Sequence, residues 1–188
     1  MNKLTFAASL SFAAADVCKF PAPQAGFTQA GYSGVWFEIA KFQTAGGAFF
    51  EKDCVCTQLD VFYENTTYKV NNLCRQKTPS GKQSSAVATL TPSGPAGHFK
   101  ESFAPLTPSV DYTIIMMGSK NGEEYSVEYD CSSNLTGTNY CVHFMSRTAT
   151  MSDSLLQYLI AEVNALELNT QNLPLQMTKQ ENCWDQFL

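Results

Sequence analysis

The chain has 188 residues, of which 44% are hydrophobic and 15% charged, and its formal net charge is −5. This length is typical of one domain, and the composition excludes wholesale disorder. Acidic and basic residues are dispersed and form no basic stripe, which argues against a nucleic-acid partner.

The first fifteen residues, MNKLTFAASLSFAAA, have the pattern of a secretory signal peptide. Lys3 gives a positive start, an uncharged run follows, and three alanines precede a cleavage point at Asp16. We therefore expect a signal peptide at 1–15 and a single domain at 16–188. The uncharged run is too short to cross a bilayer, and no other segment reaches the ~18 residues of a membrane span, so we expect no transmembrane segment.

Short alternating runs separated by turn residues follow, and they predict about eight strands. No helical pattern lies between them, which argues against a parallel α/β sheet. The strands are expected at Gly34–Ala40, Val55–Tyr63, Tyr68–Cys74, Ala86–Leu90, His98–Phe103, Asp111–Met117, Glu124–Cys131 and Tyr140–Ser146.

Two of these strands differ in which faces should be buried. In YSVEYD at 125–130, apolar and polar residues alternate, which predicts one buried face and one face in water. The run YTIIMM at 112–117 lacks this alternation, so both of its faces should be covered.

One helix is predicted near the C-terminus, beginning near Ser152. Thr150 and Asp153 have the spacing of a capping box. An apolar stripe at helical period indicates packing against a sheet, and its members are Leu155, Leu156, Leu159, Ile160, Val163 and Leu166. Residues Leu175–Lys179 are expected to add a short strand. The fold class is therefore all-β, an eight-stranded antiparallel up-and-down barrel with one C-terminal α-helix packed outside.

Seven cysteines after a leader indicate disulfides. Cys56 and Cys74 are symmetric about Asn65, so we expect a bridge between the second and third strands. Both faces of that hairpin look apolar, which leaves its register open. Cys141 is left over. It is a buried inert thiol, an intermolecular bridge or a nucleophile, or it competes with Cys18 for Cys131.

Metal binding is not expected from the sequence. Cys54 and Cys56 have the wrong spacing for a zinc knuckle. The two histidines, His98 and His143, are far apart and have no carboxylate-rich neighbourhood in the sequence. Sequons for glycosylation begin at Asn65 and Asn134, in turn-like stretches.

Several of these motifs together resemble the lipocalin family. Gly34-Val35-Trp36 followed by FEIA resembles the G-x-W signature, and FMSRTAT, with Arg147, resembles the third signature. The middle signature, a Thr-Asp after the sixth strand, is not matched, since Gly118-Ser119-Lys120 stands there. The run DCVCTQ is similar to the chloroplast-type lipocalins. YSVEYDC and LQMTKQENC are similar to apolipoprotein D, the bilin-binding insect proteins and the carotenoid-binding crustacyanins.

The resemblance implies how the barrel is closed and cross-linked. Trp36 would lie inside the closed end with the Arg147 guanidinium over its indole, and Gly34 would let the chain turn into the barrel. The resemblance also implies disulfides from Cys18 to Cys131 and from Cys54 to Cys183.

A barrel of this size encloses one small ligand, and apolar side chains are expected to line its interior. The phenols of Tyr112, Tyr125 and Tyr129 would bond the polar end of a ligand. Glu101 shares strand parity with two of these residues, so it points inward or lies solvated at an edge. The expected lining residues are Leu59, Val61, Tyr63, Leu90, Phe99, Phe103, Tyr112, Ile114, Met116, Tyr125, Val127 and Tyr129.

The expected function is to bind and carry a small hydrophobic ligand, with no required cofactor. The resemblance suggests a carotenoid, bilin, sterol, fatty acid or oxidised lipid. One alternative is a lipocalin-fold enzyme acting on a lipid or carotenoid, for which Cys141, beside His143, is the only candidate nucleophile. Another is a pigment-binding subunit of an oligomer, so both monomer and homo-oligomer stay open. We expect secretion, with the thylakoid lumen of a plastid as the alternative location.

Overall fold

A computed structural model describes residues 17–48, 51, 53–65, 67–104, 108–134 and 137–183, so the expected signal peptide lies outside the described residues. The alternating runs bounded by turn residues form strands, as predicted, and most of these strands extend a few residues beyond the predicted ranges. In chain order the elements are α1 (Gln29–Tyr32), β1 (Gly34–Gln43), β2 (Cys54–Glu64), β3 (Thr67–Gln76), β4 (Gln83–Pro92), β5 (His98–Ser102), β6 (Val110–Lys120), β7 (Glu123–Asn134), β8 (Gly137–Ser146), α2 (Asp153–Ala165) and β9 (Gln176–Met177).

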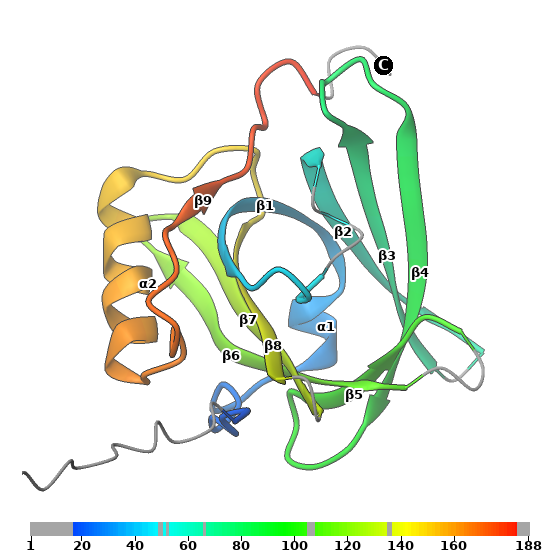
Figure 1. Cartoon of the computed structure of the whole chain (residues 1–188), viewed down its shortest axis with the longest axis vertical. Coiled ribbons are helices and arrows are strands. Elements are labelled where there is room, and N and C mark those ends of the chain that lie inside the picture. Colours follow the sequence, from blue (N-terminus) through cyan, green and yellow to red (C-terminus); the bar gives the residue numbers. More distant parts are fainter. Residues whose placement is uncertain are drawn as a thin grey trace, which may run out of the picture.

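The strands form a closed antiparallel barrel, as expected. Each of β2 to β7 pairs with its successor, and β1 closes the ring by pairing with β8 on one side and β2 on the other. Figure 1 looks into this ring, with α1 inside its outline and α2 packed outside. The short strand β9 lies within the predicted 175–179 segment and pairs with Ala40 and Lys41 of β1.

Helix α2 packs on the outside of the barrel against β1, β6, β7 and β8. The buried leucines and Val163 of its stripe form one cluster with outward-facing residues of those strands. Ser152, rather than Thr150, caps the helix, because its side chain accepts the backbone N–H of Leu155. Leu166 lies at the C-cap and is exposed, and the next turn of chain buries Leu168 instead.

Both faces of β7 are buried, which corrects the expectation of a face in water. Val127 and Tyr129 pack in the cluster under α2, with Tyr125 at its margin. The alternate residues Ser126 and Glu128 are also fully buried and face the interior of the barrel. Alternation therefore gave the correct period for this strand, but the apolar side faces the covering helix rather than the lumen. Strand β6 is covered on both faces, as predicted.

The disulfides agree with one expected pairing and contradict two. Cys18 bonds Cys131, with a Cα–Cα distance of 5.7 Å. The other bonds join Cys54 to Cys74 and Cys56 to Cys183, so the expected Cys56–Cys74 and Cys54–Cys183 bridges are wrong.

A bulge in β2 is the physical reason for this exchange of partners. Glu64 pairs with Thr67, so the hairpin is centred beyond Asn65 by half a residue. The register then shifts between Val55 and Gln58, and Cys56 takes a positive φ of 58°. Its backbone N–H is donated to the Lys179 carbonyl, which turns Cys56 toward the C-terminal segment. A symmetry argument along one strand cannot detect such a bulge.

Other expectations concern the membrane and the sequons. Within the described residues, the longest helices are too short or too polar to span a bilayer. Asn65 lies at the exposed β2–β3 turn and Asn134 is exposed at the end of β7, so glycosylation at both stays a prediction.

Candidate ligand-binding site in the barrel

One end of the barrel is closed by α1 and by a stack of Trp36 and Arg147. The Arg147 guanidinium lies 3.6 Å from the centroid of the Trp36 ring. It also donates hydrogen bonds to the carbonyls of Val35, Gly31 and Ser33, at 2.9, 2.7 and 3.0 Å. One cation thus joins the last barrel strand to the turn of α1 and to β1. This is the closure that the resemblance implied.

A buried carboxylate supports the closed end from within. Tyr32 donates its hydroxyl to Glu128 at 2.9 Å, and Tyr112 and Ser126 donate to the same carboxylate. The Trp36 indole N–H is donated to the Tyr32 carbonyl at 2.8 Å. Burial raises the pKa of Glu128, and these three hydroxyls partly offset that rise. The polar atoms at this end therefore have partners, as buried groups require.

Six of the twelve predicted lining residues lie together above the closed end. They belong to one buried cluster that also contains Trp36, Tyr32, Phe27, Val70 and Met145. Its aromatic and aliphatic members come from strands on several sides of the ring, so this part of the interior is apolar. The six are Leu59, Val61, Leu90, Phe99, Tyr112 and Ile114.

The other six predicted lining residues lie elsewhere. Met116, Tyr125, Val127 and Tyr129 face α2, outside the barrel. A bulge at Ile115 causes this for Met116, because the register of β6 shifts between Ile114 and Met116. Tyr63 is 59% exposed at the β2–β3 hairpin, where its ring lies against Tyr68. Phe103 follows the end of β5 and is outside the interior cluster.

Farther along β1, the interior becomes strongly charged. Lys41 lies 3.2 Å from Glu38 and 3.0 Å from Glu51, and all three side chains are buried. Burial opposes ionisation of Glu38, but Lys41 and His143 outweigh it and lower the pKa of Glu38 to about 2. Burial would likewise lower the pKa of Lys41, but the two carboxylates raise it. Glu51 comes from the β1–β2 connection, and its side chain is buried beside Lys41.

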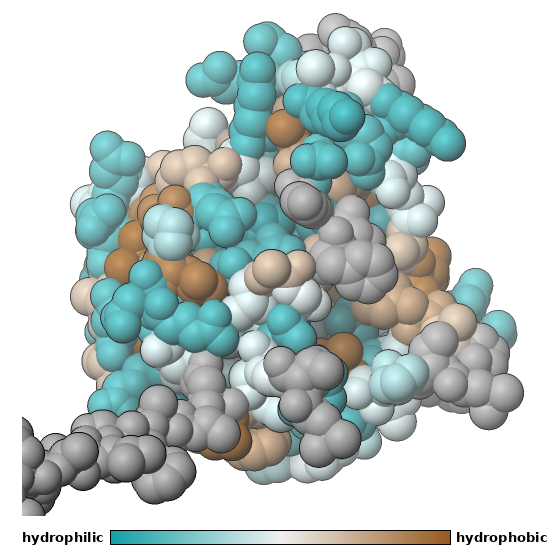
Figure 2. All heavy atoms as spheres, in the orientation of Figure 1, coloured by the Kyte–Doolittle hydropathy of each residue, from teal (hydrophilic) through white to brown (hydrophobic). Residues whose placement is uncertain are grey.

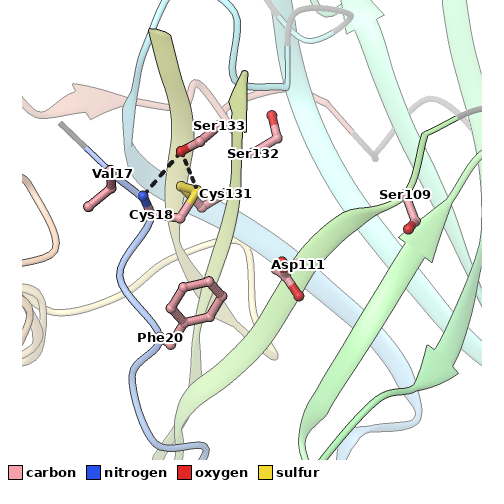
Figure 3. Close-up of a pocket in the computed structure, with 8 residues that line it drawn as sticks. All are labelled: Val17, Cys18, Phe20, Ser109, Asp111, Cys131, Ser132 and Ser133. Atoms are coloured by element: carbon pink, nitrogen blue, oxygen red, sulfur yellow. Dashed lines mark hydrogen bonds between the residues drawn. A yellow bond between two sulfur atoms is a disulfide. The ribbon is translucent and has the colours of Figure 1, made fainter. Parts of the chain in front are cut away.

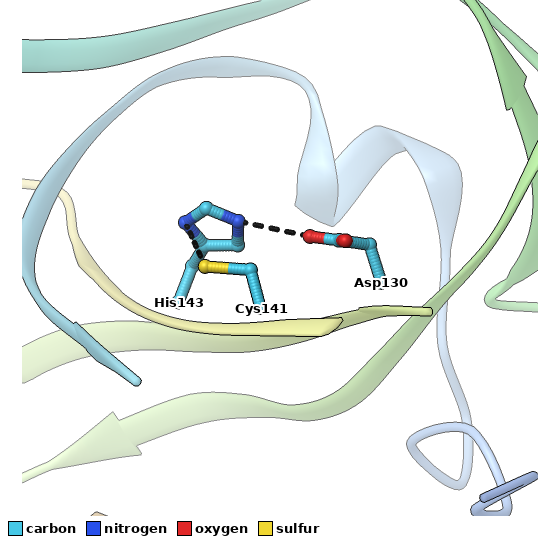
Figure 4. Close-up of side chains that lie close together, drawn as sticks. All are labelled: Asp130, Cys141 and His143. Atoms are coloured by element: carbon cyan, nitrogen blue, oxygen red, sulfur yellow. Dashed lines mark hydrogen bonds and ion pairs between the residues drawn. The ribbon is translucent and has the colours of Figure 1, made fainter. Parts of the chain in front are cut away.

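His143 is held between two carboxylates, contrary to the prediction that it has no carboxylate-rich neighbourhood. Its Nδ1 lies 2.7 Å from Glu38, and its Nε2 lies 3.1 Å from Asp130. Cys141, two residues earlier on the same face of β8, places Sγ 3.7 Å from Nδ1. Figure 4 shows the imidazole of His143 between the Cys141 sulfur, on its Nδ1 side, and the Asp130 carboxylate, on its Nε2 side. The carboxylates are distant in sequence, so proximity along the chain gave no signal of them.

The protonation states in this cluster do not favour nucleophilic catalysis. Burial raises the pKa of Cys141 to about 12, more than the attraction of His143 lowers it. Burial would lower the pKa of His143, but its hydrogen bonds to Asp130 and Glu38 raise it well above 6.5. At neutral pH the sulfur is therefore a thiol and the imidazole keeps its proton, whereas a cysteine nucleophile needs a thiolate.

Glu101 points inward, which resolves the two readings of this residue. It is 8% exposed, and its carboxyl group has no hydrogen-bond partner among the described residues. Burial, followed by repulsion from Asp130, raises the pKa of Glu101 to about 8. The side chain is therefore neutral at physiological pH and available to a ligand.

Cavities among the described residues lie at several places on the barrel wall. One, of about 380 Å³, is outside the barrel, where the N-terminal segment at Cys18 and Phe20 runs beside β7 (Figure 3). A second, of about 420 Å³, lies between Phe27 and the β4–β5 connection. The third, of about 210 Å³, is lined by Glu51, Asn72 and Cys74, and so borders the charged interior.

Figure 2 shows the surface of the molecule in the orientation of Figure 1, with hydrophilic residues in the middle of the face and hydrophobic residues beside α2.

The sequence contained one unused signal for the charged interior. Glu38 is two residues from Trp36 on β1, so strand periodicity places both on the same face. A bulge between Glu38 and Ala40 then brings Lys41, rather than Ala40, to that face. Glu51 gave no such signal, because it lies in a connection.

Comparisons with known proteins were made against sequences and solved structures. No family model matches the sequence, and no curated protein sequence matches it. Insecticyanin from the tobacco hornworm Manduca sexta superposes with a TM-score of 0.67 over 90% of each chain, at 14% identity. Lobster apocrustacyanin A1 superposes with a TM-score of 0.60 over 80% of this chain and 78% of that one, at 15% identity.

The chain has the lipocalin fold. Apocrustacyanin C1 superposes equally well, at 16% identity. These identities show the fold alone. Within the lipocalin fold, the Trp36–Arg147 closure leaves the interior of the barrel as the candidate site, with an apolar part near the closure and a charged part beyond it.

Proposed function

We propose that the protein binds and carries a small, mostly apolar ligand inside its barrel, outside the cytosol. The observation that carries this proposal is the division of the interior into an apolar zone at the closed end and a polar zone beyond it. Such a site suits a ligand with an apolar body and a polar end, because ligand pockets combine apolar lining with few orienting polar groups.

The division also suggests how a ligand would lie. Its body would contact Leu90, Phe99 and Ile114, and apolar burial at ~25 cal/mol/Å² would supply most of the affinity. Its polar end would meet Glu101 or the Lys41 group. The resemblance to carotenoid-binding and bilin-binding lipocalins keeps carotenoids, bilins, sterols, fatty acids and oxidised lipids as candidate ligands.

Three disulfides and the expected signal peptide support a location outside the cytosol. The thylakoid lumen remains the alternative compartment. Among alternative functions, a pigment-binding subunit of an oligomer uses the same interior. Native mass spectrometry of the purified protein, followed by solvent extraction, tests both by giving the subunit number and the mass of any bound ligand.

A binding experiment tests the proposed site directly. A dansyl-labelled fatty acid should bind saturably with one site per chain and with enhanced emission. Leu90→Trp fills the apolar zone and should weaken binding at least tenfold. Val87→Trp is the matched control, because Val87 is on the same strand but 48% exposed. Circular dichroism checks that both variants fold, since overpacking costs about 1–3 kcal/mol. Absence of saturable binding, or equal loss in both variants, would refute the site.

A further inference from the structure

We propose that Asp130, Cys141 and His143 bind a divalent transition-metal ion of the zinc class inside the barrel. One ligand atom from each of the three residues lies within 4.8 Å of the other two. The sulfur, imidazole nitrogen and carboxylate oxygen are a donor set that zinc prefers. This inference goes beyond the proposed ligand carriage and does not depend on it.

The strand register brings the three donors together. Asp130 on β7 is directly opposite Cys141 on β8, and His143 follows Cys141 by two residues, on the same face. Antiparallel pairing fixes these positions, so the donors lie on a rigid sheet rather than on a loop. His143 Nε2 is 3.1 Å from Asp130 Oδ2, whereas Cys141 Sγ lies at the other nitrogen, 3.7 Å from Nδ1. Donors that are 2.0–2.3 Å from a tetrahedral ion are about 3.3–3.8 Å apart, so the Cys141 side chain must rotate toward Nε2 to complete the site.

Glu38 has the position of a residue that orients a metal-binding histidine. It lies 2.7 Å from Nδ1 of His143, the nitrogen that faces away from Asp130. Such carboxylates fix the tautomer and orientation of the ring, which leaves Nε2 for the ion. Glu38 and Glu51 are a second pair of carboxylates near His143. They are less suited to bind the ion, because Lys41 already pairs with both.

An ion can reach this position. A cysteine binds zinc as a thiolate, so binding of the ion would release the Cys141 proton. The side chains of His143 and Asp130 are 11% and 12% exposed, so the site can be reached. Three protein ligands leave one coordination position for water or for a polar group of a bound molecule.

Cys141 is also the one free thiol of the chain. The other six cysteines form disulfides, and all seven lie in the described residues. A sulfur signal from a bound metal is therefore assigned to Cys141 without ambiguity. Likewise, the chain has two histidines, and His98 at the start of β5 pairs with Asp111 instead.

The experiment uses the full disulfide-bonded chain, freed of metal by a chelator and titrated with Co²⁺ and then with Zn²⁺. We expect one Co²⁺ per chain, a sulfur-to-cobalt charge-transfer absorption, and displacement of the cobalt by zinc. Cys141→Ser should abolish that absorption and weaken zinc binding at least tenfold. Asp130→Asn should weaken zinc binding and keep the absorption. His98→Ala is the matched control and should leave both unchanged.

Glu38→Gln separates an orienting residue from a ligand. It should keep the sulfur absorption but lower the affinity about 10–100-fold. The proposal is overturned if the wild-type protein shows no sulfur absorption at saturating Co²⁺, or if zinc affinity is equal in wild type and Cys141→Ser. If circular dichroism shows that Cys141→Ser does not fold, the test rests on the cobalt absorption of the wild type and on the zinc affinity of Asp130→Asn. Absence of that absorption, or an unchanged zinc affinity, would then overturn the proposal. A chain that binds the dansyl probe but not cobalt overturns this proposal alone.

Discussion

The two parts of the barrel interior differ in how their buried polar groups are paired. At the closed end, Trp36, Tyr32 and Arg147 pack closely, and the one carboxylate, Glu128, accepts three hydroxyl donors. In the middle of the barrel, by contrast, the carboxyl group of Glu101 has no hydrogen-bond partner among the described residues. The carboxylates of Glu38, Glu51 and Asp130 pair with Lys41 and His143.

This difference suggests that the closed end of the barrel serves mainly stability and the charged part serves mainly binding. Saturated polar groups and close packing favour a rigid closure, whereas an unpartnered buried carboxylate costs stability and is retained where it has another use. We therefore expect changes at the closed end to lower stability at every pH. Changes in the charged part should have effects that depend on pH.

The largest effect is expected from Glu101→Gln at high pH. The folded protein holds this carboxyl protonated until pH 8, whereas the unfolded chain ionises it near pH 4.5. A raised acid pKa means that stability is lost as pH rises from 4.5 to 8. The loss is at most about 5 kcal/mol at 1.36 kcal/mol per pKa unit. The variant should thus be more stable than wild type at pH 9 and about equal to it at pH 4.

Urea unfolding of both proteins at pH 4 and pH 9 measures this difference. An equal change of stability with pH in the two proteins would show that Glu101 is solvated or paired in the folded state.

Trp36→Ala tests the closed end. It removes a side chain that is 1% exposed, together with the stacking surface of Arg147. We expect a loss of about 4 kcal/mol in the free energy of unfolding, the usual cost of truncating a large buried aromatic residue. Val35→Ala, at the neighbouring and 39% exposed position, is the control and should cost far less. The loss should be similar at pH 5 and pH 8, unlike that at Glu101.

Acid should selectively weaken the charged part through Glu38. The pKa of this carboxyl is about 2 in the folded protein against an ordinary 4.5, because Lys41 and His143 outweigh its burial. A depressed acid pKa gives stability that is present above pH 4.5 and is lost as pH falls through 2. The contribution is about 3 kcal/mol. Glu38→Gln should lack this acid-dependent loss in urea unfolding between pH 2 and pH 6, and an unchanged slope would contradict the pairing.

The contrast also explains how much could be predicted from the sequence. The strands and the helix could be predicted from periodicity, whereas the Trp36–Arg147 closure was implied by the resemblance to the lipocalins. The charged interior could not, since it depends on the phase of each strand relative to the barrel wall. The alternation in β7 is equally compatible with Val127 or with Glu128 facing the interior of the barrel. Helix α2 covers the outside of β7, so Val127 faces the helix and Glu128 faces the interior. Bulges at Ile39 and Cys56 then reverse the facing of later residues.

The smallest effect concerns Gly34, where the chain enters β1 beside the closing stack. Its φ is +98°, a conformation that L side chains rarely adopt, and a Cβ there would lie 3.3 Å from the Arg147 guanidinium. We expect Gly34→Ala to cost about 1–2 kcal/mol, mainly through the backbone. Combining it with Arg147→Met separates the two causes in a double-mutant cycle. Additive costs would assign the effect to the backbone alone. A coupling of about 0.5 kcal/mol or more would show that the glycine also makes room for the guanidinium. The stack of Trp36 and Arg147 would then require the absence of a side chain at position 34.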